Sequence, residues 1–320
     1  MKGFYNAHIK TKRRVQLVAP FQSFTFGATS CTPQEGKNKM QNVFTLNNGV
    51  EMPMVGFSVY QVSDEKTEKA VLEALKAGYR LLDTAAIYGN EAGVGRAIKT
   101  SGILREDIFV TTKLWILREN GYENTKKALE DSLERLGLNY VDLYLMHQPL
   151  GDVHEEWRAM EDLYKAGKAR AIGVSNFHTD RLMDLMTCHE IVPAVNQIET
   201  HPFYQRDEEI AFHKEHGILQ QSWGPLAEGK FDIFTNPVLT KIAEKHGKSV
   251  AQVVLRWLNQ RGVAIIPKSV KVERMLENRD IFGFTLDEQD LADIATLNRN
   301  EIIFNHRDPK MIVWLAQARG

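Results

Sequence analysis

The sequence has few cysteines, no long apolar run and almost no net charge. Only Cys31 and Cys188 occur in 320 residues, and they lie far apart without the spacing of a metal site or redox pair. We therefore expect two free thiols in a reducing compartment such as the cytoplasm. No apolar run approaches the roughly 20 residues of a membrane helix, which predicts a soluble protein. A net charge of −1 gives no field over the whole protein that would attract nucleic acid or an anionic membrane, so any anion site must be local.

What is present is the composition of an ordinary globular protein. Hydrophobic residues make up 43% and charged residues 25% of the chain, which disfavours disorder and a fibrous fold. The length suits one large barrel or two modest domains.

The first forty residues differ from the rest. They carry seven Lys or Arg residues against a single acid, Glu35, and show no clear strand or helix periodicity. This composition is compatible with an organelle transit peptide. We favour a poorly ordered extension, a fusion scar or a start codon assigned too early, because residues 15–26 show no Arg-studded amphipathic helix and Met40 stands just before the first strand pattern. The segment 1–40 is therefore predicted to be an extension, and 41–320 a single domain.

From residue 43 onward, apolar runs alternate with helical patterns. Residues 43–46 and 50–52 flank an Asn-Asn-Gly turn, which predicts a hairpin that could plug one end of a barrel. Eight strand candidates follow, at 54–60, from 81, and at 108–113, 141–147, 169–176, 194–197, 219–223 and 263–269. Helices are predicted at 64–77, 91–99, 122–136, 154–165, 179–186, 207–216, 250–259 and 272–278. Asp64 is the expected N-cap of the first helix and Gly78 its end, and an added helix is expected over 286–298 with Thr285 as its cap.

Eight such units within about 250 residues fit an α/β fold of the (β/α)8 TIM barrel type. The alternative is an open doubly wound sheet. The first turn from strand to helix lacks the Gly-x-Gly-x-x-Gly phosphate loop of that fold, which favours the barrel.

Four residues that can carry chemistry stand at or just after the ends of the second, third and fourth strands: Asp83, Tyr88, Lys113 and His147. In a barrel these ends meet at one mouth. A buried Lys paired with a carboxylate would keep a cation near the phenol, lower the phenol pKa and make it a usable general acid. A histidine there could orient a substrate oxygen. Spacing alone leaves open that the tyrosine is a packing residue and the lysine and aspartate a structural ion pair.

Several motifs resemble those of the aldo-keto reductases. They are DTAAIYGNE at 83–91, TTKLW at 111–115, LMHQP at 145–149, GVSNF at 173–177, NQ at 196–197 and IPKS at 266–269. The resemblance runs in order from about Phe44 to Trp314 and is nearest to the microbial reductases of 2,5-diketo-D-gluconate and methylglyoxal. It implies a (β/α)8 barrel with an N-terminal hairpin and an extra C-terminal helix, which uses NADPH without a metal.

The resemblance also assigns roles to the four residues. Tyr88 would protonate the forming alkoxide, Lys113 and Asp83 would tune it, and His147 would orient the carbonyl while hydride passes from the nicotinamide. The protein would contribute positioning and charge stabilisation.

A cofactor site follows from the same resemblance. Ser175, Asn176 and Gln197 would bind the nicotinamide carboxamide, and Trp223 would stack on the ring, although ordinary core packing of Trp223 remains open. Lys268, Ser269 and Arg274 match the family's site for the 2′-phosphate, which favours NADPH over NADH. Glu277 and Asn278 match adenine contacts, and Leu226 and Val270 complete the expected set. A solvated basic stretch is the alternative for the cationic residues.

Some positions depart from the usual pattern of the family. Ser58 and Val59 replace a common Gly-Thr pair, and Trp223 replaces a frequent tyrosine. Tyr60, Trp115 and Trp223 would form an aromatic pocket, and short connections after Trp115 and Trp223 suggest little lid. Small aldehydes, α-dicarbonyls and keto sugars are the expected substrates; Tyr60 and Trp115 could instead be rim packing.

Two other functions remain possible at this stage. A nucleotide-sensing regulatory subunit would bind the cofactor with little turnover. A phosphosugar isomerase or aldolase on the same barrel would use Lys113 as a Schiff-base nucleophile and Lys268 and Ser269 for a substrate phosphate. The four polar residues and the lack of an obvious interaction domain favour the reductase. We expect a cytoplasmic monomer acting on a small carbonyl substrate, with no nucleic acid or membrane partner.

Overall fold

The computed structural model describes residues 42–115 and 121–318, which fall within one compact unit. The predicted extension at 1–40, Cys31 and the connection directly after Trp115 lie outside the described residues. Within the described ranges, Cys188 is a free, exposed thiol, as expected. None of the described helices has both the length and the apolar composition needed to cross a membrane.

Eight parallel strands form the central sheet, in the spatial order β10-β9-β8-β7-β6-β5-β4-β3. The strands are β3 (Phe57–Ser58), β4 (Leu81–Asp83), β5 (Phe109–Leu114), β6 (Val141–Met146), β7 (Ala169–Ser175), β8 (Val195–Glu199), β9 (Leu219–Trp223) and β10 (Ala264–Ile265). The two edges also meet. Gly56 N donates to Ile265 O at 2.8 Å, and Ile265 N donates to Met54 O at 3.0 Å, next to a parallel bridge between Val55 and Ile265. The sheet therefore closes on itself, which confirms the predicted (β/α)8 barrel.

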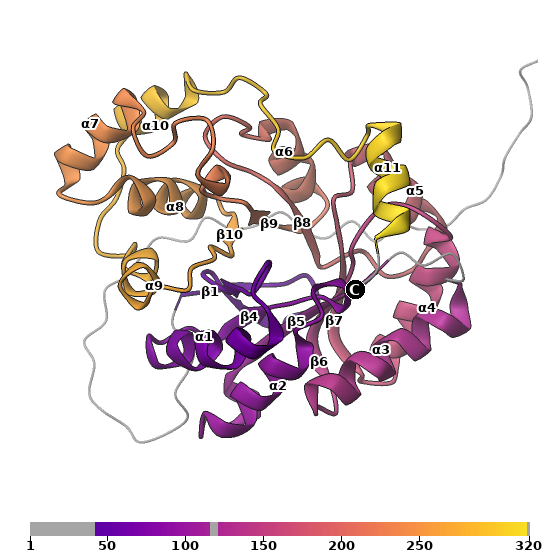
Figure 1. The fold of residues 1–320 in the computed structure, drawn as a ribbon. Helices are drawn as coiled ribbons and strands as arrows, with labels where there is room; N and C mark the ends of the chain where they lie inside the picture. The colour runs from indigo at the N-terminus through magenta and orange to yellow at the C-terminus, as the bar shows by residue number, and fades with distance from the viewer. Residues whose placement is uncertain (1–41, 116–120, 319–320) are drawn as a thin grey trace, which may run out of the picture. The chain divides into compact units, whose positions relative to one another are not determined.

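Helices separate the strands along the chain and lie outside them. They are α1 (Asp64–Lys76), α2 (Glu91–Thr100), α3 (Tyr122–Leu136), α4 (Val153–Lys165), α5 (Thr179–Cys188), α6 (Asp207–Glu215), α7 (Pro237–His246), α8 (Val250–Gln260), α9 (Val272–Arg279), α10 (Glu288–Ala295) and α11 (Pro309–Gln317). Figure 1 shows α1 to α4 following one another around the outside of β4 to β7, and neighbouring helices in this series contact each other.

Successive residues of each strand face opposite sides, which produces two apolar layers. Leu81, Phe109, Leu143 and Ala171 belong to the cluster inside the barrel, whereas their neighbours Leu82, Val110, Tyr144 and Ile172 pack outward against the helices. The alternation explains why the strand sequences are almost continuously apolar: both faces are buried.

The predicted hairpin consists of β1 (Val43–Thr45) and β2 (Glu51–Pro53), paired antiparallel. Its Leu46 and Met52 belong to the interior cluster. In the turn, the side chain of Asn48 donates to Arg170 O at 2.9 Å, at the start of β7. The hairpin therefore closes the amino-terminal end of the barrel and leaves the carboxyl ends of the strands as the open mouth.

Four details of the sequence-based prediction were wrong. Ser63, not Asp64, is the N-cap of α1, and the carboxylate of Asp64 instead accepts from Gly93 N at 2.6 Å. The late helix begins at Glu288 with an Asp287 capping box, because Leu286, next to Thr285, is buried in the core outside the helix. Helix α7, with its Asn236 cap, was not predicted, and neither was α11.

A buried histidine makes the stability of this fold depend on pH. His213 on α6 bridges two side chains: its Nε2 lies 3.0 Å from Asn196 Nδ2 and its Nδ1 2.9 Å from Gln220 Oε1. A neutral ring with its proton on Nδ1 satisfies both contacts, since the amide nitrogen donates and the amide oxygen accepts. Burial lowers the pKa of His213 to about 4.

The unfolding free energy is expected to fall in acid because of this histidine. The folded pKa lies below the value of about 6.5 for an unfolded histidine, so the unfolded state binds more protons between these limits. The contribution of His213 is fully present above about pH 6.5 and is lost as the pH falls towards 4, with a slope of up to about 1.4 kcal/mol per pH unit. Urea unfolding at pH 7 and at pH 5 measures this loss of unfolding free energy.

The difference in unfolding free energy between pH 7 and pH 5 should be smaller in His213→Gln than in the wild type. His216→Gln is the matched control, because His216 follows directly after α6 and stacks on Phe212 at 4.2 Å. Equal pH dependence in wild type and His213→Gln would contradict the assignment.

Candidate active site at the carboxyl ends of the strands

A fully buried ion pair lies at the centre of the mouth. Lys113 on β5 donates from Nζ to Asp83 Oδ1 on β4 at 2.6 Å, and the two side chains are 0% and 1% exposed. Lys113 Nζ also donates to Thr84 O at 2.9 Å and to the Tyr88 hydroxyl oxygen at 3.5 Å, so all three ammonium protons have acceptors. Burial lowers the pKa of Lys113, and the charge of Asp83 opposes that shift.

Tyr88 ends a short 3-10 helix (Ala86–Tyr88) directly after β4. Because Lys113 donates to the phenol oxygen, the hydroxyl proton of Tyr88 is left free to donate elsewhere. The ring lies 5.1 Å from that of Tyr60 and 5.7 Å from that of His147.

The pKa of Tyr88 moves opposite to our expectation. Loss of water around the phenol is the main cause of a pKa well above 10, with further increases from Asp83 and Tyr60. The expected lowering of this pKa is therefore not the net result, because the loss of water around the phenol and the nearby charge of Asp83 outweigh the attraction of the Lys113 cation. The phenol is therefore firmly protonated at neutral pH.

His147 follows β6 and stands beside Tyr88. Its ring makes an edge contact with Trp115 at 5.0 Å as well as with Tyr88. Burial, followed by the charges of Lys113 and His306, lowers the pKa of His147 well below 6.5. The imidazole is thus neutral, and no described residue hydrogen-bonds its Nδ1. A neutral imidazole has one N–H to donate, which suits the polarisation of a carbonyl oxygen.

A network of amides and hydroxyls supports this group. Gln197 on β8 donates from Nε2 to Asp83 Oδ2 at 2.8 Å and to Gln221 Oε1 at 2.7 Å. Ser175 Oγ donates to Gln197 O at 2.8 Å, and Asn176 Nδ2 donates to His147 O at 3.0 Å. The structure therefore brings the three residues expected at the nicotinamide to the same mouth as the four catalytic candidates.

Backbone geometry brings these residues close. Asn176 has a φ of 62°, in the left-handed region that few non-glycine residues adopt. Three residues earlier, a Cβ on Gly173 would lie 2.5 Å from Val195 O, so only glycine allows β7 and β8 to approach here. Two positions of the GVSNF segment are thus explained by local structure.

Trp223 ends β9 at the same mouth. Its indole Nε1 donates to Asn176 Oδ1 at 2.8 Å, which fixes the ring orientation, and the side chain is half-buried. The ring packs partly against the interior cluster, so the packing alternative holds for one side of it. Leu226, three residues on, is also half-buried.

The residues expected around the 2′-phosphate lie between β10 and the end of α9. Lys268, Val270 and Arg274 are exposed, whereas Ser269 and Asn278 are buried and Glu277 is half-buried. Lys271 N donates to Ser269 Oγ at 3.1 Å, which shapes the loop that leads into α9. In the described part of the chain, neither Lys268 nor Arg274 makes an ion pair, so both cations are available to an anion.

The end of the chain lines the mouth, which sequence reasoning missed. Glu199 at the end of β8 accepts from Ile303 N at 2.5 Å and from Phe304 N at 3.4 Å. Trp115 Nε1 donates to Ala318 O at 3.1 Å, and the ring of His306 lies 5.9 Å from that of Trp223. Glu199 is a charged residue at a strand end and could have been noted. Nothing in the local sequence of Phe304 or His306 indicates their position.

Tyr60 and Trp115 have different environments. Tyr60 is 44% exposed against Tyr88, whereas Trp115 is 8% exposed and packs with Leu315. Together with Trp223, they give the mouth an aromatic wall. The connection after Trp223 holds only a short 3-10 helix (Ala227–Gly229) before α7.

Comparisons with known proteins agree with this geometry. The chain is 51% identical to glyoxal reductase of Bacillus subtilis over 265 residues, covering 82% of this chain and 95% of that protein. It is 42% identical to methylglyoxal reductase of Escherichia coli over 262 residues, covering 81% and 94%. The crystal structure of a Bombyx mori aldo-keto reductase in complex with NADP superposes with a TM-score of 0.78 at 35% identity, covering 82% of this chain and 94% of that one.

The profile of the Aldo/keto reductase family matches residues 54–299, from the first strand of the barrel to just beyond α10. The expectation drawn from the motifs is thereby confirmed, and the chain belongs to the aldo/keto reductase family of oxidoreductases.

Proposed function

We propose that this protein reduces aldehydes and ketones to alcohols with NADPH, and that its substrates are small aldehydes, α-dicarbonyls and keto sugars. The observation that carries the proposal is the position of the Tyr88 phenol, whose oxygen accepts from the buried Lys113–Asp83 pair and whose ring lies next to His147. This arrangement supplies one acid and one hydrogen-bond donor at the same end of the barrel, which is what reduction of a carbonyl requires.

Three side chains, those of His147, Tyr88 and Lys113, would act one after another during the reduction. His147 donates a hydrogen bond to the carbonyl oxygen and holds it near Tyr88. As negative charge develops on that oxygen, Tyr88 transfers its hydroxyl proton. Lys113, which donates to the phenol oxygen, stabilises the phenolate that this transfer leaves behind. Asp83 keeps the ammonium in place.

When bound, NADPH would supply the hydride. The exposed cations Lys268 and Arg274, which have no ion-pair partner among the described residues, fit a phosphate. Ser175, Asn176 and Gln197 lie together at the mouth, where they would hold the nicotinamide amide. The Bombyx mori relative bound to NADP supports the choice of cofactor.

The environment of Lys113 weighs against Schiff-base chemistry. Its ammonium group is fully buried and all three protons are donated, so a substrate carbonyl has no access to a free amine. An isomerase or aldolase that uses Lys113 as a nucleophile is therefore disfavoured.

The substrate class rests on the aromatic mouth and on the relatives. Tyr60, Trp115 and Trp223 offer flat apolar surface beside the two polar groups, which suits small or planar carbonyl compounds. The names of the two bacterial relatives, glyoxal reductase and methylglyoxal reductase, point to α-dicarbonyls. The exposed free thiol of Cys188 supports a reducing compartment such as the cytoplasm.

The direct test is NADPH oxidation with methylglyoxal, phenylglyoxal, 4-nitrobenzaldehyde and a keto-sugar acid, measured beside NADH. We expect turnover with a clear preference for NADPH. Tight binding of NADPH without turnover on any of these carbonyls would contradict the proposal and favour a nucleotide sensor.

Cofactor preference can be tested at one cation. Arg274→Ala is expected to raise the KM for NADPH by about tenfold to a hundredfold, because a hydrogen bond to a charged group contributes about 1.5–3 kcal/mol. The KM for NADH should change little, since NADH lacks the 2′-phosphate. Lys99→Ala, which removes an exposed cation from α2, is the control. Equal changes for both cofactors would refute the role of Arg274.

A further inference from the structure

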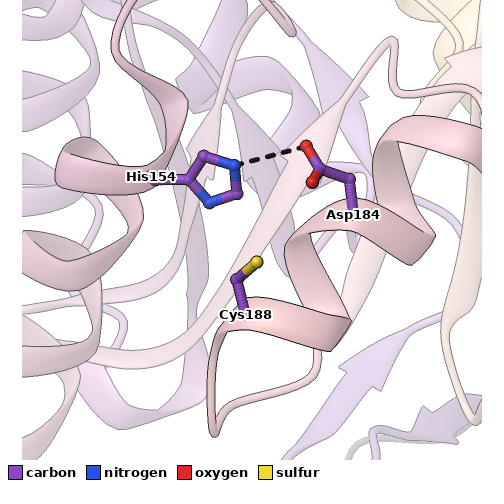
Figure 2. Close-up of side chains that lie close together, drawn as sticks. All are labelled: His154, Asp184 and Cys188. Carbon is purple, nitrogen blue, oxygen red and sulfur yellow. Dashed lines mark hydrogen bonds and ion pairs between the residues drawn. The ribbon is translucent and has the colours of Figure 1, made fainter. Parts of the chain in front are cut away.

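A second group of metal-binding side chains lies away from the mouth, between α4 and α5. His154 is in the first turn of α4, and Asp184 and Cys188 stand four residues apart on one face of α5. Figure 2 shows the imidazole, the carboxylate and the thiol turned towards one another. One ligand atom from each lies within 4.8 Å of the others, and His154 Nε2 is 3.2 Å from Asp184 Oδ2. None of the three contacts Asp83, Tyr88, Lys113 or His147 in any described interaction.

Two further residues stand behind His154. Its Nδ1 lies 3.0 Å from His189 Nε2, and the two rings stack at 5.2 Å with an angle of 14°. On its other side, His189 Nδ1 lies 3.8 Å from Glu161 Oε2, and both of these side chains are buried, at 4% and 9% exposure. A buried carboxylate favours the proton on the ring nitrogen that faces it.

One arrangement of the ring protons satisfies these contacts and leaves a ligand atom for a metal. With its proton on Nδ1, His189 presents the lone pair of Nε2 to His154, which then donates from its own Nδ1. The lone pair of His154 Nε2 is thereby turned towards the carboxylate of Asp184 and the thiol of Cys188. In this tautomer a metal ion can lie between the lone pair of His154 Nε2 and the carboxylate; in the other tautomer the Nε2–H of His154 donates to Asp184 Oδ2 at 3.2 Å, and a metal ion would replace that proton.

We propose that His154, Asp184 and Cys188 bind a divalent transition metal ion of the zinc type. Imidazole nitrogen, carboxylate oxygen and thiolate sulfur are the three ligand types that zinc takes from proteins, and water would complete a four-coordinate site. Binding converts the thiol to a thiolate, so one proton leaves for solvent as the metal–sulfur bond forms. Glu161 and His189 act as positioning residues, because histidine ligands commonly donate their second N–H to such a partner.

The alternative is a surface ion pair in which a proton occupies the place of the metal. Arg181 already pairs with Asp184 at 3.3 Å, so the carboxylate has a neighbouring charge without any metal. An ion pair of this kind needs no thiol and no ordered histidine behind it. The two possibilities therefore differ in what they require of Cys188 and His189.

Cobalt and zinc are the probes for the test, added to the full chain without a histidine tag after treatment with a chelator. We expect one Co²⁺ per chain with a thiolate-to-cobalt charge-transfer band, displaced by Zn²⁺ in a calorimetric titration. Cys188→Ser and His154→Gln should each abolish the band. The matched controls Cys31→Ser, which removes the other thiol of the chain, and His216→Gln should retain it.

The positioning residues give an independent readout. His189→Gln is expected to weaken Zn²⁺ binding by about 10–100-fold, while the charge-transfer band persists at saturating Co²⁺. The proposal is overturned if no thiolate band forms, if Zn²⁺ affinity is unchanged in Cys188→Ser, or if His189→Gln binds as tightly as the wild type. Both probes report on binding alone, so the result does not depend on the carbonyl reductase activity.

Discussion

Replacing Tyr88 by phenylalanine is expected to lower kcat by about a hundredfold to ten-thousandfold, the usual contribution of a general acid. The reason is that the phenol contacts both the ion pair and the His147 ring, and phenylalanine at this position has no proton to transfer. Binding of NADPH, measured by fluorescence titration, should be nearly unchanged, because Tyr88 is not among the residues assigned to the cofactor.

Tyr60→Phe is the matched control for this variant. The ring of Tyr60 lies 5.1 Å from that of Tyr88 at an angle of 55°, and Tyr60 is 44% exposed. The described hydrogen bonds of the Lys113 ammonium go to Asp83, Thr84 and Tyr88, not to Tyr60. We expect a change in the KM for the carbonyl and little change in kcat. Normal turnover in Tyr88→Phe, or an equal loss of kcat in Tyr60→Phe, would remove Tyr88 from the acid role.

The second large effect is expected at the buried ion pair. Lys113→Met leaves the carboxylate of Asp83 at 1% exposure without its counter-charge, and breaking a buried pair in this way costs about 3–5 kcal/mol of unfolding free energy. Turnover should also be lost, because the phenolate of Tyr88 would have no cation to stabilise it. Urea unfolding and single-turnover reduction measure the two effects separately.

The double variant Asp83→Asn with Lys113→Met separates stability from chemistry. Asparagine is neutral and its Oδ1 can still accept from Gln197, so no unpaired charge remains in the core. We expect this protein to unfold at a higher urea concentration than Lys113→Met alone, but to stay inactive. If Lys113→Met is as stable as the wild type, the pair is not the buried charged contact described above.

The barrel could be predicted because its signals are local. Each strand is an apolar run ended by a polar residue, and helices such as α3 are bounded by glycine at both ends, so that its bounds, Tyr122–Leu136, match the prediction. Helix α7 was missed although Asn236 and Pro237 form a regular start signal, because the preceding stretch reads as irregular. The predicted start of α10 was wrong because the apolar Leu286 was assigned to the helix. Leu286 is buried by tertiary packing and lies before the first residue of the helix.

The site was only partly predictable, for a similar reason. The positions of Asp83, Lys113 and His147 follow from where the strands end, and those of Ser175 and Gln197 from the family motifs. The direction of the Tyr88 pKa depends mainly on how much water burial removes from around the phenol, and then on the distance to Asp83, and neither can be read from spacing. The contact between Glu199 and Ile303 joins residues 104 positions apart, and no local pattern indicates it.

Because Glu199 holds residues 303 and 304 at the mouth, the mouth is complete only after the last part of the chain has been translated. All four catalytic candidates have been synthesised once residue 147 is translated, whereas Phe304, His306 and Ala318, which complete the wall of the mouth, are translated about 160 residues later. A premature stop codon after residue 299 would therefore spare all four catalytic candidates and remove the segment that lines the mouth. For the same reason, a library of variants confined to residues 300–318 could change which carbonyl compounds are accepted while leaving the acid, the ion pair and the cofactor loop untouched.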